Sequence, residues 1–272
     1  MPVKMDRIKP KQSLGQNFLI DRNIAQKMIY HLKPGKEDYI VEIGPGTGMV
    51  TGFLAGTCGR LLLIETDRRA VGMLKERFKS DERITVVQGD VLELSLSEVT
   101  GGHGAVRVIG NIPYNITSPI LFHLMDERRY ISDVMLLVQN EFAHRIQAVH
   151  STPSYGIMSV LAQTWATISY LFKVSPTVFY PRPSVDSAVI HLVFDQERSD
   201  IPDEHLYQTI VRGTFGKRRK MLRSSLRSIF PELAFRPDSF SVDLNKRPED
   251  CSVDEFIKLT QEIYYAINRR HQ

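Results

Sequence analysis

The chain has 272 residues, of which 42% are hydrophobic and 24% are charged, a balance typical of globular proteins. This composition excludes the collagen-like, intrinsically disordered and disulfide-rich classes, and no apolar run approaches the roughly 20 residues of a membrane-spanning helix. The net charge of +4 suits a polyanionic partner without establishing one.

The chain carries no clear signal of export or of metal binding. Residues 1–11 are basic, but no apolar block follows them, so we expect no secretory signal. Cys58 and Cys251 are far apart in the sequence, which favours free thiols in a cytoplasmic protein. The eight histidines lack the spacing of metal ligands, so we expect no metal.

Five short apolar runs recur at regular intervals in the first half of the chain. They lie at 39–43, 61–65, 84–88, 105–109 and 134–138. Each is too short for a buried helix and too continuously apolar for a sheet with one face in water. The segment 67–79, between the second and third runs, has the apolar spacing of a helix. The pattern predicts an α/β fold with a doubly wound, mostly parallel sheet.

The segments around these runs predict helices and two more strands. Helices are expected at 24–32, 140–149 and 154–165. Asp21 or Asn23 would cap the first of them. The runs 168–174 and 188–194 predict a hairpin that completes a seven-stranded sheet, with the proline-rich loop 176–183 between them.

The composition changes at 195–203, which is polar, contains a proline and has few apolar anchors. We place a domain boundary there. It separates an α/β domain with an N-terminal arm, residues 1–195, from a small C-terminal helical domain, residues 203–272. Helices of the small domain are expected at 204–214, 217–229 and 253–267.

A glycine-rich segment, Gly44-Pro45-Gly46-Thr47-Gly48, follows the first strand. Glycine allows a ligand to approach the backbone closely, because no Cβ stands in the way. The spacing G-x-G-x-G is one residue shorter than the dinucleotide fingerprint, and no phosphate-binding P-loop sequence is present. Taken alone, the segment is also compatible with a tight turn that binds nothing.

Polar residues follow four successive strands of the predicted sheet. Gly44, Glu65, Asp90 and Asn111 are 21, 25 and 21 residues apart, so each falls at the carboxyl end of a strand, where open α/β sheets bind ligands. Glu65 can accept hydrogen bonds from both ribose hydroxyls, and Asp90 from an adenine amine. Alone, Glu65 suits a solvated strand end and Asp90 an N-cap. Together the positions indicate an adenosine cofactor, and the glycine spacing favours S-adenosylmethionine over NAD.

The tetrapeptide Asn111-Ile112-Pro113-Tyr114 suits methylation of an exocyclic amine on a planar base. The Asn111 side-chain carbonyl and a nearby backbone carbonyl can accept the two N–H bonds, which turns the nitrogen lone pair toward the methyl group. Pro113 stiffens the turn, and Tyr114 offers a stacking face for a flipped base. Catalysis would rest on positioning and electrostatics. The alternative for the tetrapeptide alone is a proline-containing turn after a strand.

These motifs resemble those of the KsgA-type small-subunit ribosomal RNA adenine dimethyltransferases, a group that includes the erythromycin-resistance methylases. The resemblance covers nearly the whole chain. Its signatures are Gln16–Leu19, Glu42–Gly48, Glu65–Asp67, Gly89-Asp90, Asn111–Asn115 and Phe179–Val189. The last signature is similar to the ribosomal branch rather than to the resistance branch.

The resemblance implies a Rossmann-like class I methyltransferase fold and a role for each matching residue. The residues expected to bind S-adenosylmethionine are Asn17, Leu19, Gly44, Gly46, Glu65, Asp90 and Asn111. Asn111 would lie beside the methyl group, Tyr114 at the target base, and Phe179 on the other side of that base; without the resemblance Phe179 would be assigned to the core. The implied product is N6,N6-dimethyladenosine at two adjacent adenosines near the 3′ end of 16S rRNA, made during small-subunit biogenesis by a cytoplasmic monomer.

Residues 212–227 contain seven basic side chains and no acidic one. On a helix, Arg219, Arg223 and Arg227 would share one face, with Lys220 beside them and Arg218 adjacent. Such a group suits contacts to RNA phosphates, which give affinity but little sequence information. A solvated charged face is the alternative. The arm 4–11, with Arg7 and Lys9, could add contacts.

Four functions can be compared on this basis. The first is an rRNA adenine N6-dimethyltransferase. The second is a ribosome-assembly factor in which methylation is secondary, because the basic group is large relative to a single-base pocket. The third is a resistance methylase acting on large-subunit rRNA, against which 179–189 argues. The fourth is an NAD-dependent dehydrogenase, disfavoured by the glycine spacing and by the lack of a hydride-site His or Lys.

Overall fold

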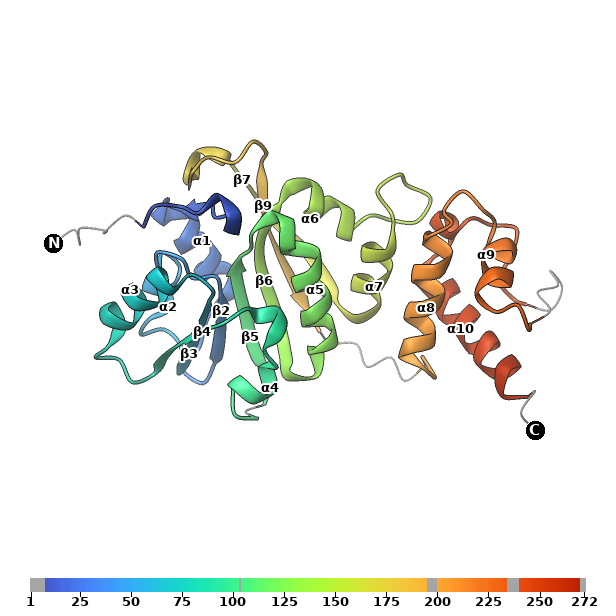
Figure 1. Ribbon diagram of the computed structural model, residues 1–272, viewed down its shortest axis with the longest axis horizontal. Helices are drawn as coiled ribbons and strands as arrows, with labels where there is room; N and C mark the ends of the chain where they lie inside the picture. The colour runs from blue at the N-terminus through green and yellow to red at the C-terminus, as the bar shows by residue number, and fades with distance from the viewer. Residues whose placement is uncertain (1–7, 103, 195–199, 234–239, 270–272) are drawn as a thin grey trace. The chain divides into compact units, whose positions relative to one another are not determined.

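The computed structural model describes residues 8–102, 104–194, 200–233 and 240–269, and the contacts within it divide the chain into two units (Figure 1). The first unit consists of residues up to Ala143 together with Ser169–Phe194. The second consists of His144–Ile168 and the residues from Asp195 onward. Residues 1–7 of the basic N-terminal arm lie outside the described residues, as do residues 195–199 at the expected domain boundary.

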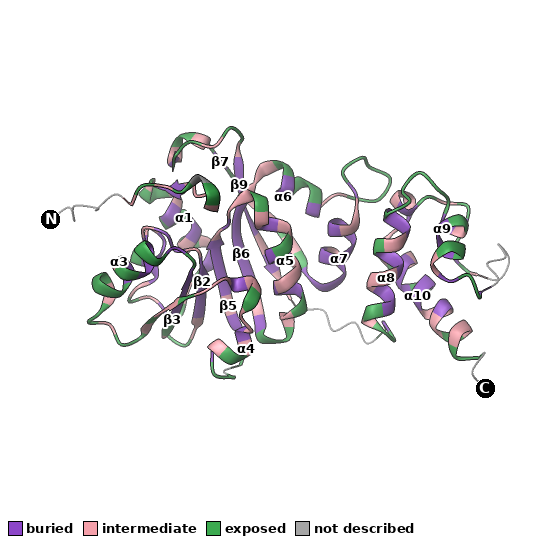
Figure 2. Cartoon of the chain, in the orientation of Figure 1, coloured by how far each residue is buried: buried purple, intermediate pink, exposed green. Residues whose placement is uncertain are grey.

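A seven-stranded sheet forms the centre of the first unit, in the order β4-β3-β2-β5-β6-β9-β7. Its strands are β2 (Tyr39–Ile43), β3 (Arg60–Glu65), β4 (Ile84–Gln88), β5 (Val106–Asn111), β6 (Ile131–Gln139), β7 (Thr167–Val174) and β9 (Ser187–Val193). The first five in the order are parallel, and β9 runs antiparallel to β6. Buried residues concentrate in the central strands (Figure 2). The predicted α/β class and the mostly parallel sheet are confirmed.

The helices of the first unit connect successive strands. They are α1 (Arg22–Leu32), α2 (Thr51–Leu54), α3 (Arg68–Phe78), α4 (Leu96–Val99) and α5 (Thr117–Asp126), and α6 (Asn140–Ile146) follows β6. The Asp21 side chain caps α1, because it accepts from the backbone N–H groups of Asn23 and Ile24. Asp67 caps α3 in the same way. Helix α6 ends at Ile146, three residues before the predicted end.

A second, two-stranded sheet pairs β1 (Phe18–Leu19) with β8 (Phe179–Tyr180). The strands are antiparallel, with Phe18 opposite Tyr180 and Leu19 opposite Phe179. The backbone N–H of Ile20 extends the pairing to the carbonyl of Val178, at 2.9 Å. The sequence did not predict this sheet, because two-residue strands carry no periodic pattern.

The second unit is helical and packs around Tyr207, which is fully buried. Its helices are α7 (Ile157–Trp165), α8 (Glu204–Phe215), α9 (Leu222–Ile229) and α10 (Val253–Asn268). The Tyr207 hydroxyl lies 2.6 Å from Oγ1 of Thr164 on α7, and its ring makes an edge contact with Trp165. Within the described ranges, no helix is long and apolar enough to cross a membrane.

Two features of the second unit differ from the sequence expectations. Residues 144–168 were placed in the domain 1–195, but they group with the C-terminal helices, because α7 is buried on nearly every side and packs against α8 and α10. The helix expected at 217–229 begins only at Leu222. Residues 217–220 are four adjacent cations, which would repel one another within a single helical turn, and they form a turn instead.

Candidate active site

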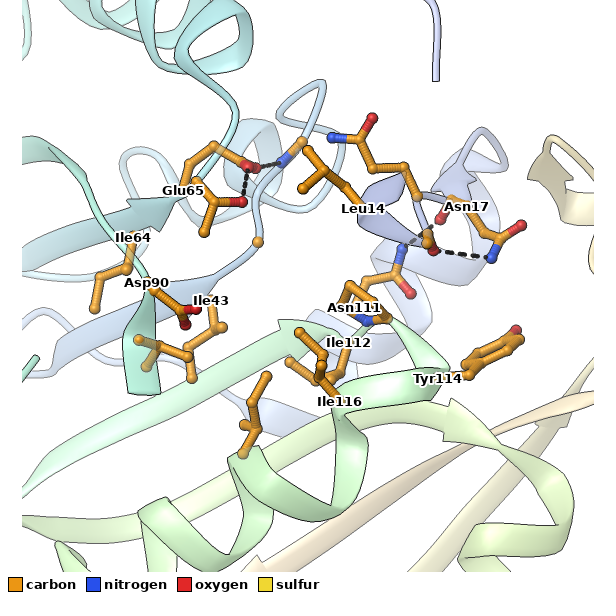
Figure 3. Close-up of a pocket in the computed structure, with 18 of the residues that line it drawn as sticks. Leu14, Asn17, Ile43, Ile64, Glu65, Asp90, Asn111, Ile112, Tyr114 and Ile116 are labelled. Atoms are coloured by element: carbon orange, nitrogen blue, oxygen red, sulfur yellow. Dashed lines mark hydrogen bonds between the residues drawn. The ribbon is translucent and has the colours of Figure 1, made fainter. Parts of the chain in front are cut away.

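A cavity of about 710 Å³, a volume that includes space open to solvent, lies at the carboxyl edge of the parallel strands. Gly44, Glu65, Asp90 and Asn111, the four strand-end positions singled out in the sequence, all line it. Figure 3 shows Glu65 and Asp90 on one side of the cavity, with Asn111 and Tyr114 on the other. The regular βα spacing therefore brings these residues to one place.

The remaining wall is formed by residues 11–19, which we call the strap. Leu14 to Phe18 line the cavity. Gln16 Nε2 donates to Asp67 Oδ2 at 3.2 Å, and Lys11 Nζ lies 3.7 Å from Asp67 Oδ1. Asp67 is buried, and its hydrogen bonds with Arg69 hold the pKa of its carboxyl well below the usual range. No local pattern predicts this anchor, because Gln16 and Asp67 are 51 positions apart.

Gly46 lies in the glycine segment at a position that tolerates no side chain. Its φ is +54°, in the left-handed region that favours glycine. A Cβ on Gly46 would lie 2.8 Å from Cδ1 of Phe18 in the strap. The glycine thus lets the strap approach the turn that follows β2.

The Glu65 carboxylate is buried and held by two backbone donors. Its Oε2 accepts from Gly46 N at 3.0 Å, and its Oε1 accepts from Asp67 N at 2.8 Å. Burial raises the pKa of Glu65, and the hydrogen bonds oppose that shift. Each carboxylate oxygen has further acceptor capacity, so a ligand in the cavity can bind to both.

Asp90 has two functions in the structure that the sequence presented as alternatives. Its Oδ1 accepts from Leu92 N at 3.0 Å, which caps the short 3-10 helix Val91–Glu93. The same residue lines the cavity. The cap fixes the side chain, so its remaining acceptor positions have a defined direction.

Glu42 is a buried carboxyl beneath the site to which sequence reasoning gave no individual role. It is 3% exposed, and its Oε2 accepts from Oγ1 of Thr51 at 2.7 Å. Burial raises the pKa of Glu42 to about 7. It lines a smaller cavity together with Gly44, Leu19 and Asn111. Its position in β2, two residues before Gly44, is the signal that could have identified it.

Asn111 is oriented by the strap. Its Nδ2 donates to the backbone carbonyl of Asn17 at 2.9 Å, so Oδ1 is the end of the amide that can accept from a ligand (Figure 3). The Asn17 side chain in turn donates to the carbonyl of Gly15 at 3.3 Å. In the turn after Asn111, the Pro113 carbonyl accepts from Ile116 N.

Tyr114 begins the 3-10 helix Tyr114–Ile116 and lines the cavity. Its hydroxyl lies 2.6 Å from Oγ of Ser187 on β9. Burial raises the pKa of Tyr114 above its ordinary value, so the phenol is neutral at physiological pH. Sequence reasoning missed Ser187, although it stands inside the signature that ends at Val189.

The structure does not bring Phe179 to the larger cavity. Phe179 and Leu19 are each 3% exposed and belong to one apolar cluster of the core. Side chains alternate along a strand, so the next residue, Tyr180, points outward and is 54% exposed. Leu19 lines the smaller cavity, with Glu42 and Gly44, and is not part of the lining of the larger one.

The basic residues at 218–227 lie in the second unit. Arg218, Arg219 and Lys220 are exposed in the turn before α9 and line a surface hollow with Lys217 and Ser224. The expected stripe on one helix is wrong in one respect, because Arg219 precedes α9 and only Arg223 and Arg227 lie on it. Arg218 forms an ion pair with Glu249 and donates to the Pro153 carbonyl at 3.1 Å.

The part of the chain that the structure describes holds no cluster of three His, Cys, Asp or Glu side chains able to bind a metal. Cys58 and Cys251 are buried free thiols. Burial raises the pKa of Cys251 to about 12, so it is protonated at physiological pH.

The model of one protein family, described as "Ribosomal RNA adenine dimethylase", matches residues 7–264. A relative named "Ribosomal RNA small subunit methyltransferase A" from Porphyromonas gingivalis is 42% identical over 258 residues, which is 94% of this chain and 98% of the relative. A relative of the same name from Chlorobium phaeobacteroides is 38% identical over 260 residues, 96% of each chain.

Solved structures show the same fold. A dimethyladenosine transferase from Plasmodium falciparum superposes with a TM-score of 0.80 at 23% identity, covering 92% of this chain and 98% of the other. The 23S rRNA methyltransferase ErmE gives 0.67 at 23% identity, covering 91% and 100%. The match of the family model and the identity to the bacterial relatives confirm the resemblance seen in the motifs. The chain belongs to the ribosomal RNA adenine dimethylase family.

Proposed function

We propose that this chain transfers methyl groups from S-adenosylmethionine to N6 of two adjacent adenosines near the 3′ end of small-subunit (16S) rRNA, giving N6,N6-dimethyladenosine, and that it acts as a monomer. The observation that carries the proposal is a single cavity with two kinds of wall. One side holds acceptors suited to an adenosine, Glu65 and Asp90; the other holds Asn111 and Tyr114. The names of the bacterial relatives support the small subunit.

The residues of the cavity fit S-adenosylmethionine. Two carboxylates, Glu65 and Asp90, line the larger cavity, and its described lining includes no Lys or Arg. A ligand with a sulfonium and an ammonium group suits such a lining, whereas the pyrophosphate of a dinucleotide would meet two like charges. Ile43 and Ile64 add apolar surface for a purine ring. The charge of the site therefore favours the sulfonium cofactor over NAD.

Within this site we assign Glu65 to the ribose hydroxyls, Asp90 to the adenine amine, and the strap to the methionine part. When bound, the cofactor supplies an electrophilic methyl group. Gly44 and Gly46 keep the turn after β2 free of side chains. Asn17 and Leu19 hold the strap in place through the Asn17 carbonyl and the packing of Leu19 in the core.

Asn111 is assigned to the reacting amine. A base amine is a weak nucleophile because its lone pair is delocalised into the ring. Oδ1 of Asn111 and one backbone carbonyl can accept its two N–H bonds and so favour a pyramidal nitrogen. The Pro113 carbonyl already accepts from Ile116 N and from Thr117 Oγ1. We therefore assign the second acceptor to the carbonyl of Ile112.

Tyr114 supplies a stacking face for the flipped base, and Pro113 keeps the turn rigid. No general base is assigned, because the amine loses its proton readily once it carries the extra methyl group. The site contributes mainly by holding the amine in line with the methyl group. Phe179 reaches the base from the other side only if β8 moves from its observed position, since its side chain lies in the core.

Gly46→Ala is expected to weaken the binding of S-adenosylmethionine about tenfold, because a Cβ at this position displaces Phe18 and strains the backbone. Isothermal calorimetry with the cofactor measures this effect. Gly56→Ala is a matched control: Gly56 also has a positive φ, +84°, but a Cβ there meets nothing within 4 Å. If both variants bind the cofactor like the wild type, the close approach of the strap has no role in binding.

The Arg219→Ala/Lys220→Ala variant is expected to bind small ribosomal subunits severalfold more weakly. The slope of log affinity against log salt should fall by about one for each phosphate contact removed. Filter binding at several salt concentrations measures both. Arg218→Ala is the comparison, because its guanidinium is already paired with Glu249, so the slope should change less. An unchanged slope in the double variant would contradict RNA contact at this turn.

Transfer of labelled methyl from S-adenosylmethionine tests the proposed function. The acceptors are small subunits lacking the modification and, separately, large-subunit rRNA, and the products are digested to nucleosides and identified by mass. We expect dimethyladenosine from the small subunit alone. Label on large-subunit rRNA would instead indicate a resistance methylase. Subunit binding without label would indicate an assembly factor.

A further inference from the structure

We infer that Ser187 is a positioning residue for Tyr114, and that it fixes the place of the aromatic ring on which the target base stacks. The inference rests on the proposed function, since it assigns a purpose to an interaction next to the proposed base site. It concerns a residue outside the lining of the larger cavity.

The geometry holds Tyr114 at both ends. Its backbone follows Pro113 and begins a 3-10 helix, which restricts the Cα position. Its hydroxyl lies 2.6 Å from Oγ of Ser187, a normal distance for a strong O–H···O hydrogen bond. Ser187 is 0% exposed, so its hydroxyl is screened from competing water. A ring fixed at Cα and at the hydroxyl cannot swing away about Cα, so its long axis keeps one direction.

The topology explains how a serine from a distant segment reaches this edge of the sheet. The parallel strands end at the cavity, so only an antiparallel strand can begin there. β9 is that strand, and Ser187, its first residue, pairs with Gln139, the last residue of β6. The preceding carbonyl, that of Asp186, accepts from Asn140 N at 3.0 Å. Ser187 therefore stands on a rigid part of the sheet.

The chemistry requires such an anchor because Oδ1 of Asn111 is fixed independently, through Nδ2 and the carbonyl of Asn17. A base stacked on Tyr114 presents its amine to Oδ1 of Asn111 only when the ring lies in one place. If the ring swings away, the amine leaves the line of attack even though every residue of the cavity is present. Small errors of position at this step are costly to the rate.

A double-mutant cycle tests the inference, with Ser187→Ala, Tyr114→Phe and the double variant. We measure kcat for methyl transfer to small subunits, cofactor affinity by calorimetry, and Tm. Each single variant is expected to lose about tenfold in kcat, as for loss of one partly buried hydrogen bond, with cofactor affinity within about twofold of wild type. The double variant should be no slower than the slower single one, because both remove the same interaction.

Controls separate positioning from a structural role. Ser184→Ala, an exposed serine on the preceding loop, should retain wild-type kcat. Ser187→Cys fills the buried position with a slightly larger thiol, which is a weaker hydrogen-bonding group. It leaves no cavity, so kcat should fall at unchanged Tm even if Ser187→Ala is unstable. Wild-type kcat in Ser187→Ala or Ser187→Cys, or losses that multiply to about a hundredfold in the double variant, would overturn the inference.

Different results would contradict the proposed function itself. If the wild-type chain transfers no methyl group to small subunits, or if Tyr114→Ala transfers at the wild-type rate, Tyr114 has no base to position and both ideas fall. If Tyr114→Ala is slow and Ser187→Ala is not, the proposed function stands and only the role of Ser187 is rejected.

Discussion

Asn111→Ala is expected to lower the rate of methyl transfer by about 10²–10³, the usual effect of removing one preorganised hydrogen-bonding group from an active site. Without Oδ1 the amine loses one of its two acceptors, and the lone pair stays delocalised in the ring. Single-turnover transfer to small subunits gives this rate. S-adenosylmethionine should still bind within a few-fold of the wild-type affinity by calorimetry, since Glu65 and Asp90 are intact. Retention of the wild-type rate would refute the assignment of Asn111.

Asn111→Asp tests the role of the Asn111 amide nitrogen separately from that of the amide oxygen. The aspartate keeps an acceptor near the position of Oδ1 but cannot donate to the Asn17 carbonyl, which lies 2.9 Å from Nδ2. It would place a carboxylate against that carbonyl, so we expect weaker cofactor binding in addition to a slower rate. Weaker binding in Asn111→Asp but not in Asn111→Ala would identify repulsion of the strap as the cause.

Glu65→Ala is expected to weaken cofactor binding at least a hundredfold, because each of two hydrogen bonds to a charged carboxylate contributes roughly 1.5–3 kcal/mol. The substitution also leaves the Gly46 and Asp67 N–H groups without their acceptor, which loosens the turn after β2. Calorimetry measures the affinity directly. At saturating cofactor the rate should recover to within a few-fold, since Asn111 and Tyr114 are unaffected.

Thr66→Ala is a matched control for Glu65→Ala. Thr66 also lines the cavity, and no ribose contact is assigned to it. Its hydroxyl donates to Oε1 of Glu65 over a long 3.5 Å, so its removal should change affinity little. Equal affinities of Glu65→Ala and the wild type would rule out the ribose assignment. Equal losses in the two variants would point to general disturbance of the turn after β3.

The sequence predicted the sheet of the first unit well because the information is local. Each parallel strand is a short apolar run that its composition identifies. The runs of β2, β3, β5 and β6 are covered on both faces, whereas β4, at the edge of the sheet, has no buried residue. The pairing of β1 with β8 could not be found in this way. It joins Phe18 to Tyr180, and two-residue strands have no pattern to read. The late start of α9 was missed because the i, i+4 spacing of Arg219, Arg223 and Arg227 suggests one helix, although the adjacent charges at 217–220 oppose it.

For the candidate site, the sequence predicted which residues lie together but not the contacts between them. Gly44, Glu65, Asp90 and Asn111 could be placed together because strand ends in a parallel sheet meet at one edge. The interactions that orient them were not predictable. Asn111 with Asn17, and Tyr114 with Ser187, are 94 and 73 positions apart, and no local rule joins such pairs. Phe179 is the opposite case. We expected it at the target base, but the alternation of side chains along β8 places it in the core.

The strap lines the cavity that we assign to the cofactor, and it also holds the amide of Asn111. In the proposed reaction each adenosine receives two methyl groups, so the spent cofactor must be replaced once between them. A displacement of the strap that moves Asn17 releases Nδ2 of Asn111 from the Asn17 carbonyl. The strap therefore couples cofactor exchange to the orientation of Asn111, because Nδ2 has the Asn17 carbonyl as its partner only while the strap is in place.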